Sequence, residues 1–179
     1  PSISVVDINN DSKPDIVVAN SGSNSASVLL NAGSGTFLPQ TSYGTGSAPF
    51  SLAVADVNAD NKSDIVVVNA GSNTVSILLN TGSGTFSPQV TYGTGSFPMS
   101  GTVVDVNNDN RPDIVVANSG SSSVSVLLNA GSGTFPSQTT YATGTSPNSV
   151  AVVDVNNDNK PDIVITNSGG NSVNVFLRC

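Results

Sequence analysis

The chain alternates short apolar runs with short polar connectors, and the runs have the lengths and periods of β-strands. Ser149–Asp154 and Asp162–Asn167 are rich in Val and Ile on both faces, whereas Ser123–Asn129 alternates Ser with Val and Leu. These patterns predict two strands that are buried on both faces and one with a period-two alternation. A fourth strand is predicted from Phe135 to Tyr141, where polar residues separate two aromatic ones. No segment has the 3.6-residue apolar period of a helix.

This four-strand pattern recurs along the chain with a period of 49 residues. The phrase Leu-Leu-Asn-x-Gly-Ser-Gly-Thr-Phe begins at Leu29, Leu78 and Leu127. Other residues that coincide at this period are Phe37, Phe86 and Phe135; Tyr43, Tyr92 and Tyr141; and Pro49, Pro98 and Pro147. Four antiparallel strands in about 40–50 residues form the blade of a β-propeller. We therefore predict an all-β fold with propeller-type blades of four antiparallel strands, in a single repeat domain over residues 1–179.

The predicted blades cover about residues 1–49, 50–98, 99–147 and 148–179, and the last one is incomplete. It ends after its third strand, and no strand of the fourth type comes before Pro1. A propeller protects its edges by closing the ring, and four blades with a strand missing leave an edge open. We therefore expect these units to belong to a longer array, with self-association through exposed strand edges as one way to cover them.

A nine-residue acidic loop recurs between the first and second predicted strands. The loops are residues 7–15, 56–64, 105–113 and 154–162, and they share the pattern Asp-x-Asn-x-Asp-x-Lys/Arg-x-Asp. They contain all 12 acidic residues of the chain, which has no Glu. Carboxylates held this close repel one another unless a cation lies among them. A hard cation with oxygen ligands is the natural candidate.

Calcium suits these loops, because it takes about six to eight oxygens from carboxylates, amides, backbone carbonyls and water. Side chains at positions one, three, five and nine are predicted ligands, and position seven contributes its backbone carbonyl while its charged head points to solvent. The predicted ligands are Asp7, Asn9, Asp11, Lys13 and Asp15; Asp56, Asn58, Asp60, Lys62 and Asp64; Asp105, Asn107, Asp109, Arg111 and Asp113; and Asp154, Asn156, Asp158, Lys160 and Asp162. We thus predict up to four Ca²⁺ ions. The alternative is that the loops are Asp/Asn-rich β-turns whose side chains cap their own backbone.

Composition argues against several other classes of function. The net charge of −7 disfavours a nucleic acid or an anionic membrane as partner, and no apolar run reaches the roughly 18 residues of a membrane-spanning helix. The chain has no His, and its carboxylates are concentrated in the loops. Its one thiol, Cys179, has no base near it in sequence. Acid–base or nucleophilic catalysis is therefore not expected, and we predict neither catalytic residues nor an organic cofactor.

Two stretches carry a resemblance to a known family. These are Pro-x-Ser-Val-x-Val-x-Asp-x-Asn-x-Asp-x-x-Pro-Asp-Ile-Val and Ser-Val-x-Val-Leu-Leu-Asn-x-Gly-x-Gly-x-Phe, and together they cover nearly the whole chain. The sequence resembles the FG-GAP/VCBS repeat family, which includes the calcium-bearing blades of integrin α-subunit propellers. The family's usual Gly at loop position six is replaced by Ser12, Asn61, Asn110 and Asn159. Asn tolerates a left-handed backbone better than Ser, so the first loop departs furthest from the family.

The resemblance implies a calcium-binding, non-catalytic scaffold that serves in adhesion or protein interaction outside the cell. A calcium-dependent, lectin-like propeller that binds glycans is the alternative. Tyr43, Tyr92 and Tyr141 separate the two interpretations, because they can either line equivalent sugar pockets or pack against the neighbouring blade. The partner, protein or glycan, is not identified by the short and nearly identical loops.

Overall fold

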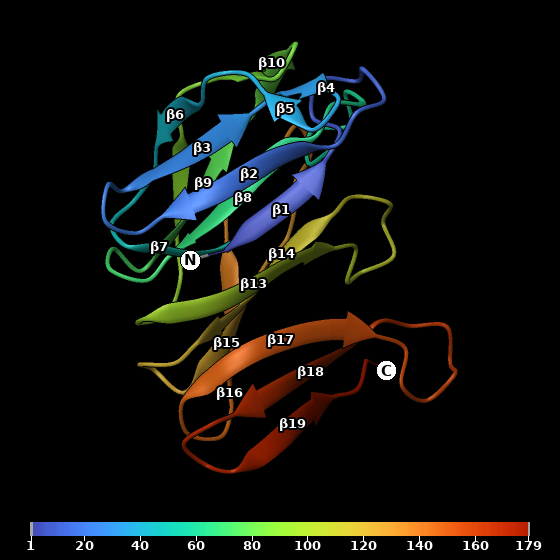
Figure 1. The fold of residues 1–179 in the computed structure, drawn as a ribbon. Coiled ribbons are helices and arrows are strands. Elements are labelled where there is room, and N and C mark those ends of the chain that lie inside the picture. Colours follow the sequence, from blue (N-terminus) through green and yellow to red (C-terminus); the bar gives the residue numbers. More distant parts are fainter. Residues whose placement is uncertain (1, 179) are drawn as a thin grey trace.

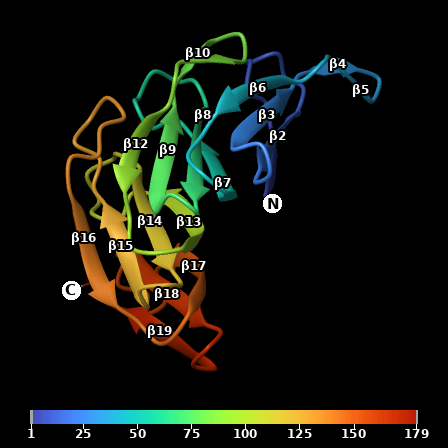
Figure 2. The same cartoon turned by 90° about the vertical axis from the view of Figure 1, so that its left-hand side faces the viewer.

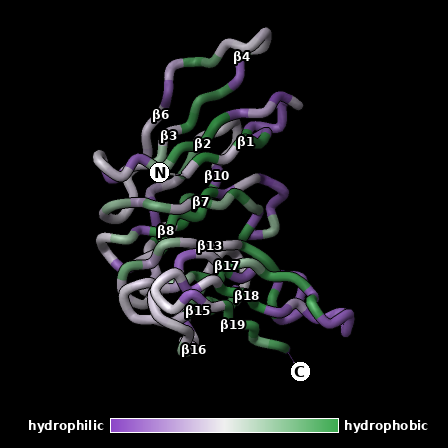
Figure 3. Tube along the Cα trace, turned by 60° about the horizontal axis from the view of Figure 1, so that its bottom comes forward, coloured by the Kyte–Doolittle hydropathy of each residue, from purple (hydrophilic) through white to green (hydrophobic). Residues whose placement is uncertain are grey.

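The computed structural model describes residues 2–178, and Cys179 lies outside them. The described chain is all-β, as predicted, and its strands form four main sheets and two small hairpins. Among these residues there is no helix with the length and apolarity needed to cross a membrane. Figure 3 shows that hydrophobic residues follow the strands and hydrophilic ones gather in the loops.

The four main sheets correspond to the four predicted units, and we call them blades one to four. Blade one contains β1 (Ile3–Val6), β2 (Asp15–Asn20), β3 (Ser25–Leu29) and β6 (Thr41–Gly44). Blade two contains β7 (Pro49–Ala55), β8 (Asp64–Asn69), β9 (Thr74–Leu78) and β12 (Val90–Gly93). Blade three contains β13 (Pro98–Val104), β14 (Asp113–Asn118), β15 (Ser123–Leu127) and β16 (Gln138–Ala142). Blade four contains β17 (Pro147–Val153), β18 (Asp162–Asn167) and β19 (Ser172–Phe176).

The strands of each blade are antiparallel and follow one another in chain order. The hairpins β4 (Asn31–Gly33) with β5 (Thr36–Phe37) and β10 (Asn80–Gly82) with β11 (Thr85–Phe86) lie between the third and fourth strands of blades one and two. Blade four has three strands among the described residues, in agreement with the incomplete last unit expected from the sequence.

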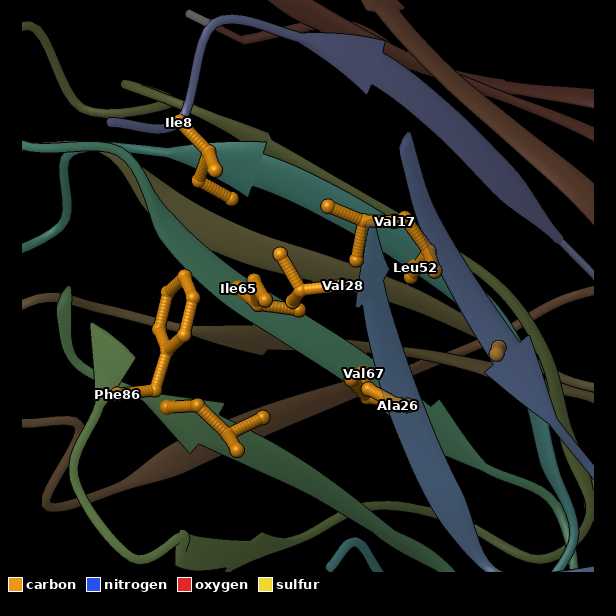
Figure 4. Packing of buried hydrophobic residues seen from close by; sticks show 10 residues of the cluster. Ile8, Val17, Ala26, Val28, Leu52, Ile65, Val67 and Phe86 are labelled. Atoms are coloured by element: carbon orange, nitrogen blue, oxygen red, sulfur yellow. The ribbon is translucent and has the colours of Figure 1, made fainter. Parts of the chain in front are cut away.

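The blades stack face to face, with blade one at one end and blade four at the other (Figures 1 and 2). The first strands β1, β7, β13 and β17 are successive neighbours through this stack. A separate apolar cluster fills each of the three junctions between blades. The first cluster, drawn in Figure 4, joins Ile8, Val17, Ala19, Ala26 and Val28 of unit one to Leu52, Ile65, Val67, Leu78 and Phe86 of unit two.

The fourth strand of blade three has different bounds from those predicted from the sequence. It begins at Gln138 and not at Phe135, because the phenylalanine turns away from the sheet and into the junction with the preceding blade. Phe86 occupies the same place one unit earlier, at the end of its hairpin. The rings of Tyr43 and Phe86 meet edge to face with centroids 5.2 Å apart, and those of Tyr92 and Phe135 with centroids 5.5 Å apart. These two tyrosines therefore pack against the neighbouring unit.

The connectors between blades are held by polar contacts at the ends of the strands that lie opposite the acidic loops. Asn69, at the end of β8, is fully buried and donates to Ser76 Oγ over 2.8 Å. The backbone N–H of Gly46 donates to the same hydroxyl over 3.2 Å. A Cβ atom at Gly46 would lie 2.4 Å from Ser72 Oγ and 2.7 Å from Asn69 Nδ2, so only glycine fits. This close approach brings the chain from blade one to the start of β7.

The inserted phenylalanine gives a test of the stacking, because the segments Leu29–Phe37 and Leu127–Phe135 have the same sequence. The Phe135 side chain is 2% exposed, whereas that of Phe37 is 39% exposed on the hairpin that extends from blade one (Figure 2). We expect Phe135→Ala to lower the free energy of unfolding by about 3–5 kcal/mol through loss of buried area and the cavity left behind. Phe37→Ala is the matched control, and in dilute solution it should cost about 1 kcal/mol or less. Chemical denaturation measures both, and equal losses would contradict the stacking.

Candidate metal centre

The acidic loops connect the first and second strands of every blade, so the fold places all four at equivalent positions. They follow β1, β7, β13 and β17 and lead directly into β2, β8, β14 and β18. Figure 1 shows the loops after β1, β13 and β17 emerging on the same side of the stack. Within a loop, hydrogen bonds connect positions one, three, five and seven, as in residues 56–62. Position nine is the first residue of the following strand and accepts the N–H of position two. Residues of different loops remain on different blades.

The carboxylate at position one is surrounded by backbone N–H groups of its own loop. Asp56 Oδ1 accepts from Asn58, Ala59 and Asp60 at 2.7–3.2 Å, and Asp56 Oδ2 accepts from Asn61 over 2.7 Å. Similar contacts are made to Asp7, Asp105 and Asp154. Desolvation acts to raise the pKa of Asp105 and of Asp154, but four backbone hydrogen bonds to each carboxylate outweigh it, and the net pKa is lowered. The charged carboxylate is therefore the favoured form at position one in these two loops.

The side chains at positions three and five also accept backbone N–H groups of the loop. The side-chain oxygen of Asn58 accepts the N–H of Asp60 over 3.1 Å, and Asp60 Oδ1 accepts the N–H of Lys62 over 2.9 Å. These contacts are the backbone caps that the β-turn interpretation predicts, so the loops are Asx-type turns whatever else they bind. Because each oxygen has further lone pairs, capping does not exhaust their capacity as ligands.

The cationic residue at position seven lies differently from the sequence prediction in the first two loops. Its charged head folds back on position five while the side chain stays partly exposed: Lys62 Nζ lies 2.9 Å from Asp60 Oδ2, and Lys13 Nζ lies 3.3 Å from Asp11 Oδ2. The ammonium group is attracted to the locally excess negative charge of the loop. The hydrogen bond from Lys62 is the main reason why the pKa of Asp60 is lowered. A cation that binds this carboxylate has to compete with the lysine.

Every loop contains two residues other than glycine in the left-handed backbone conformation. They stand at positions four and six, and their φ angles lie between 59° and 66°. These residues are Asn10, Ser12, Ala59, Asn61, Asn108, Asn110, Asn157 and Asn159. A residue with a Cβ atom pays about 1–2 kcal/mol for this conformation, and Asn tolerates it best. Ser12 and Ala59 adopt it as well, so the loop geometry is kept even where the residue type opposes it.

The carboxylate at position nine lies beneath the loop and is completely buried in all four units. Asp64 Oδ2 accepts the N–H of Val57 over 3.0 Å, and Asp64 Oδ1 accepts the N–H of Asn80 over 2.8 Å. Asp15, Asp113 and Asp162 repeat both contacts. Burial raises the pKa of Asp64 and of Asp113, although these hydrogen bonds act to lower it. The ninth residue thus ties position two of its loop to the residues that follow the third strand.

A side chain of the following unit donates a hydrogen bond to each of the first two loops. Asn80 Nδ2 donates to the backbone oxygen of Ile8 over 2.8 Å, and Asn129 Nδ2 donates to that of Val57 over the same distance. Gly84 packs so closely that a Cβ atom there would lie 2.8 Å from Leu30 and 3.5 Å from Asn9. We did not assign these asparagines to the site from the sequence. Their signal was the recurrence of Asn after Leu-Leu at the period of the loops.

The donors available in a loop are mixed, and this decides which ion fits. Within residues 2–178, no three or more Asp, Glu, His or Cys side chains form a group that could hold a metal by themselves. A bound ion therefore has to take amide or backbone oxygens in addition to carboxylates. This donor set of hard oxygens without nitrogen or sulfur fits calcium and does not fit zinc.

The third tyrosine differs from the other two. Tyr141 is 46% exposed and lines a pocket of about 610 Å³ between blades three and four. Its ring lies 6.0 Å from that of Phe176, in a tilted arrangement. Val106, Leu128 and Arg178 are also in the wall. The pocket beside Tyr141 corresponds to the space that Phe86 and Phe135 fill beside Tyr43 and Tyr92 at the two preceding junctions.

Comparison with solved structures finds the same fold in longer proteins. A lectin from Agrocybe aegerita that recognises non-reducing terminal N-acetylglucosamine is 23% identical, with a TM-score of 0.60, over 96% of this chain and 50% of that one. An auxiliary nutrient binding protein from Bacteroides ovatus is 14% identical, with a TM-score of 0.63, over 97% of this chain and 47% of that one. The biofilm matrix protein Bap1 of V. cholerae is 20% identical, with a TM-score of 0.55, over 94% of this chain and 29% of that one. The chain thus spans half or less of the length of these three proteins.

Comparison of sequences identifies the repeat. None of the curated proteins compared with this chain matches it significantly. The sequence model of the FG-GAP-like repeat matches three times, over residues 7–67, 56–116 and 105–165. Each match begins at the first aspartate of an acidic loop and ends in the second strand of the following blade. The three overlapping matches cover most of the chain, which therefore belongs to the FG-GAP-like repeat family.

Proposed function

We propose that the chain is a calcium-binding, non-catalytic repeat scaffold, which serves as an adhesion or protein-interaction module of an extracellular protein. The observation that carries this proposal is the fourfold recurrence of one loop geometry. Each copy presents carboxylate and amide oxygens at positions one, three and five, and each copy keeps two left-handed residues. Calcium ligation accounts for the oxygen donors and the left-handed residues together, whereas turn formation alone does not.

The energetic cost of the left-handed residues is an argument that these loops bind an ion. Strained residues persist where the surrounding structure needs them, and such places are commonly binding sites. Ala59 has no side-chain oxygen with which to compensate for its φ of 63°. The residue nevertheless keeps the geometry in which four backbone N–H groups converge on Asp56. The same geometry holds the carboxylate, the Asn58 amide and the Asp60 carboxylate in one turn.

The energetics favour an environment rich in calcium. With free calcium at about 1 mM and a dissociation constant of about 0.1 mM, each occupied site would stabilise the fold by about 1.4 kcal/mol. Four such sites together would contribute roughly 5–6 kcal/mol, which is comparable to the whole net stability of a typical domain. The proposed function therefore places the protein outside the cell, where calcium reaches this concentration.

The side chains also favour binding over chemistry. The chain has neither His nor Glu, and the aspartates at positions one and nine already accept backbone hydrogen bonds. A general base needs a carboxylate or imidazole that is free to exchange a proton with a substrate. We therefore assign the module a binding role, with a protein or a glycan as partner.

Calcium titration tests the proposal directly. Isothermal calorimetry on chelator-treated protein should show up to four equivalents bound. The melting temperature should rise with calcium and fall again after the chelator is added, because the ion binds the folded state only. Magnesium at the same concentration is the control and should produce a smaller shift, because it dehydrates reluctantly. Absence of both heat and thermal shift at millimolar calcium would contradict a metal site.

Two substitutions in the third loop separate ligation from folding. Asp109 is exposed, whereas Asp113 is completely buried and accepts the N–H groups of Val106 and Asn129. Asp109→Ala should remove one calcium equivalent and leave the stability of the calcium-free protein nearly unchanged. Asp113→Ala should remove the same equivalent but also destabilise the calcium-free protein, by about 1–3 kcal/mol for each buried N–H left unpaired. Four equivalents retained in Asp109→Ala would be evidence against ligation at position five.

A calcium-dependent glycan-binding propeller is the second candidate, and one observation favours it. Tyr141 offers an exposed aromatic ring in a pocket that also contains Asn107, Thr139 and Arg178. An aromatic face with a few polar groups around it is a suitable platform for a sugar ring. The similarity to the Agrocybe aegerita lectin concerns the fold, so the pocket itself carries this candidate.

A glycan array with and without calcium tests the second candidate. If the pocket binds a sugar, Tyr141→Ala should abolish the hits, whereas Tyr141→Phe keeps the ring and should retain most of them. A circular dichroism melt on both variants checks that the fold is intact. An array without hits at either calcium concentration would exclude the lectin-like candidate and leave the protein-binding scaffold.

A further inference from the structure

The two ends of the stack expose apolar residues, and most of these residues have buried or half-buried equivalents in other units. At the end formed by blade four, the exposed fractions are 47% for Val155, 58% for Val173, 49% for Val175 and 55% for Leu177. We call this set the blade-four face. At the other end they are 62% for Ile3, 61% for Val5, 39% for Phe37 and 50% for Leu38. We call this set the blade-one face.

The repeat shows what covers the blade-four face inside the protein. The counterparts of Val155 one, two and three units earlier are Val106, Val57 and Ile8, which are 8%, 2% and 2% exposed. The counterparts of Val175 are Val126, Ile77 and Val28, which are 7%, 1% and 2% exposed. Each of these residues belongs to the cluster between its own blade and the following one. The natural cover of the blade-four face is therefore the sheet face with which a following blade packs against its predecessor, as blade two packs against blade one.

The blade-one face presents the equivalents of residues that cover a preceding blade inside the protein. Its residues Ile3 and Phe37 correspond to Leu52 and Phe86, which are both 8% exposed and lie in the cluster between blades one and two. Val5 corresponds to Val54, which packs against the same cluster. The two end faces are thus the two halves of a junction that the molecule already forms three times between its blades.

Polar and close-packing contacts repeat in the same way. Asn80 Nδ2 donates to Ser63 O and also across the junction to Ile8 O. Asn31 Nδ2 makes the first of these contacts, with Pro14 O, and the repeat places the acceptor of the second at Val155 O of a preceding blade. Gly84 packs against Leu30, whereas the equivalent Gly35 has open space beside it. Leu177 is the repeat equivalent of Leu30.

We propose that the blade-four face of one copy of this chain binds the blade-one face of a second copy, head to tail. The second copy is the partner whose surface matches in apolar positions, in the Asn31 donor and in the space beside Gly35. Because the interface is heterologous, it can close into a ring when the rotation between copies allows it. Two copies of four blades would make eight, which is at the upper end of the usual four to eight blades of a propeller.

Analytical ultracentrifugation of the chain over a wide range of concentrations tests the pairing. The wild-type protein should sediment as two chains or more and dissociate on dilution. Val175→Glu, on the blade-four face, and Val5→Glu, on the blade-one face, should each weaken association about a hundredfold or more, because a carboxylate would be buried among apolar side chains. Val90→Glu is the matched control, since Val90 is 52% exposed on β12, away from both faces, and this variant should associate like the wild type.

Mixing the variants distinguishes head-to-tail pairing from other arrangements. A mixture of Val175→Glu and Val5→Glu keeps one junction between two unaltered faces, so it should regain a species of two chains that neither variant forms alone. A circular dichroism melt of each variant checks folding, and Leu177→Glu serves as a second blade-four variant if Val175→Glu is unstable. A wild-type protein that stays a single chain at all concentrations would overturn the proposal. So would association lost in Val175→Glu but kept in Val5→Glu, because the blade-four face would then bind itself.

Discussion

Each blade of this protein is a thin sheet with two apolar faces, and the rest of the structure follows from the need to cover both. The strands β2 and β14 have the same sequence, Asp-Ile-Val-Val-Ala-Asn. In β14, with a blade on either side, every residue is buried, whereas in β2 buried residues alternate with half-buried ones. Hydrophobic burial is proportional to the area removed from water, so a blade gains its full stabilisation only between two others. Stability is thus a property of neighbouring pairs of blades, as in other repeat proteins.

The acidic loops are coupled to this stacking through a small set of buried polar groups. The ninth aspartate, for example Asp64, anchors its own loop by accepting the N–H groups of Val57 and Asn80. The side chain of the same Asn80 reaches the loop of the preceding unit and donates a hydrogen bond to the backbone oxygen of Ile8. One asparagine therefore connects two loops on adjacent blades. Because these groups are shielded from water, their hydrogen bonds fix the loop geometry more strongly than the exposed contacts at positions three and five do.

The abundance of Asn, Ser and Gly in this chain has a conformational reason. Positions four and six of the acidic loops are left-handed, and so are turn residues such as Asn24, Asn73 and Ser122 between the second and third strands. Asn is the residue after glycine that tolerates this backbone best. Polar composition here reflects tight turns between short strands, and the Val and Ile of the strands form the clusters between blades.

The sequence by itself determined the repeat, the strand type and the composition of the loops. The period of 49 residues and the alternation of apolar positions are local signals, so they predicted a second strand at Asp162–Asn167, where the structure has β18. The oxygen donors of each loop lie within nine residues, and their chemistry could likewise be recognised without the fold. What only the tertiary structure decided is how identical segments differ. Phe37 and Phe135 end the same nine residues, yet one is exposed and the other is buried against the preceding blade. The same holds for the placement of Asn129 over the loop of another unit and for the burial of Asp113 beneath its own. These outcomes depend on which blade lies alongside, and that information is not contained in any local stretch of sequence.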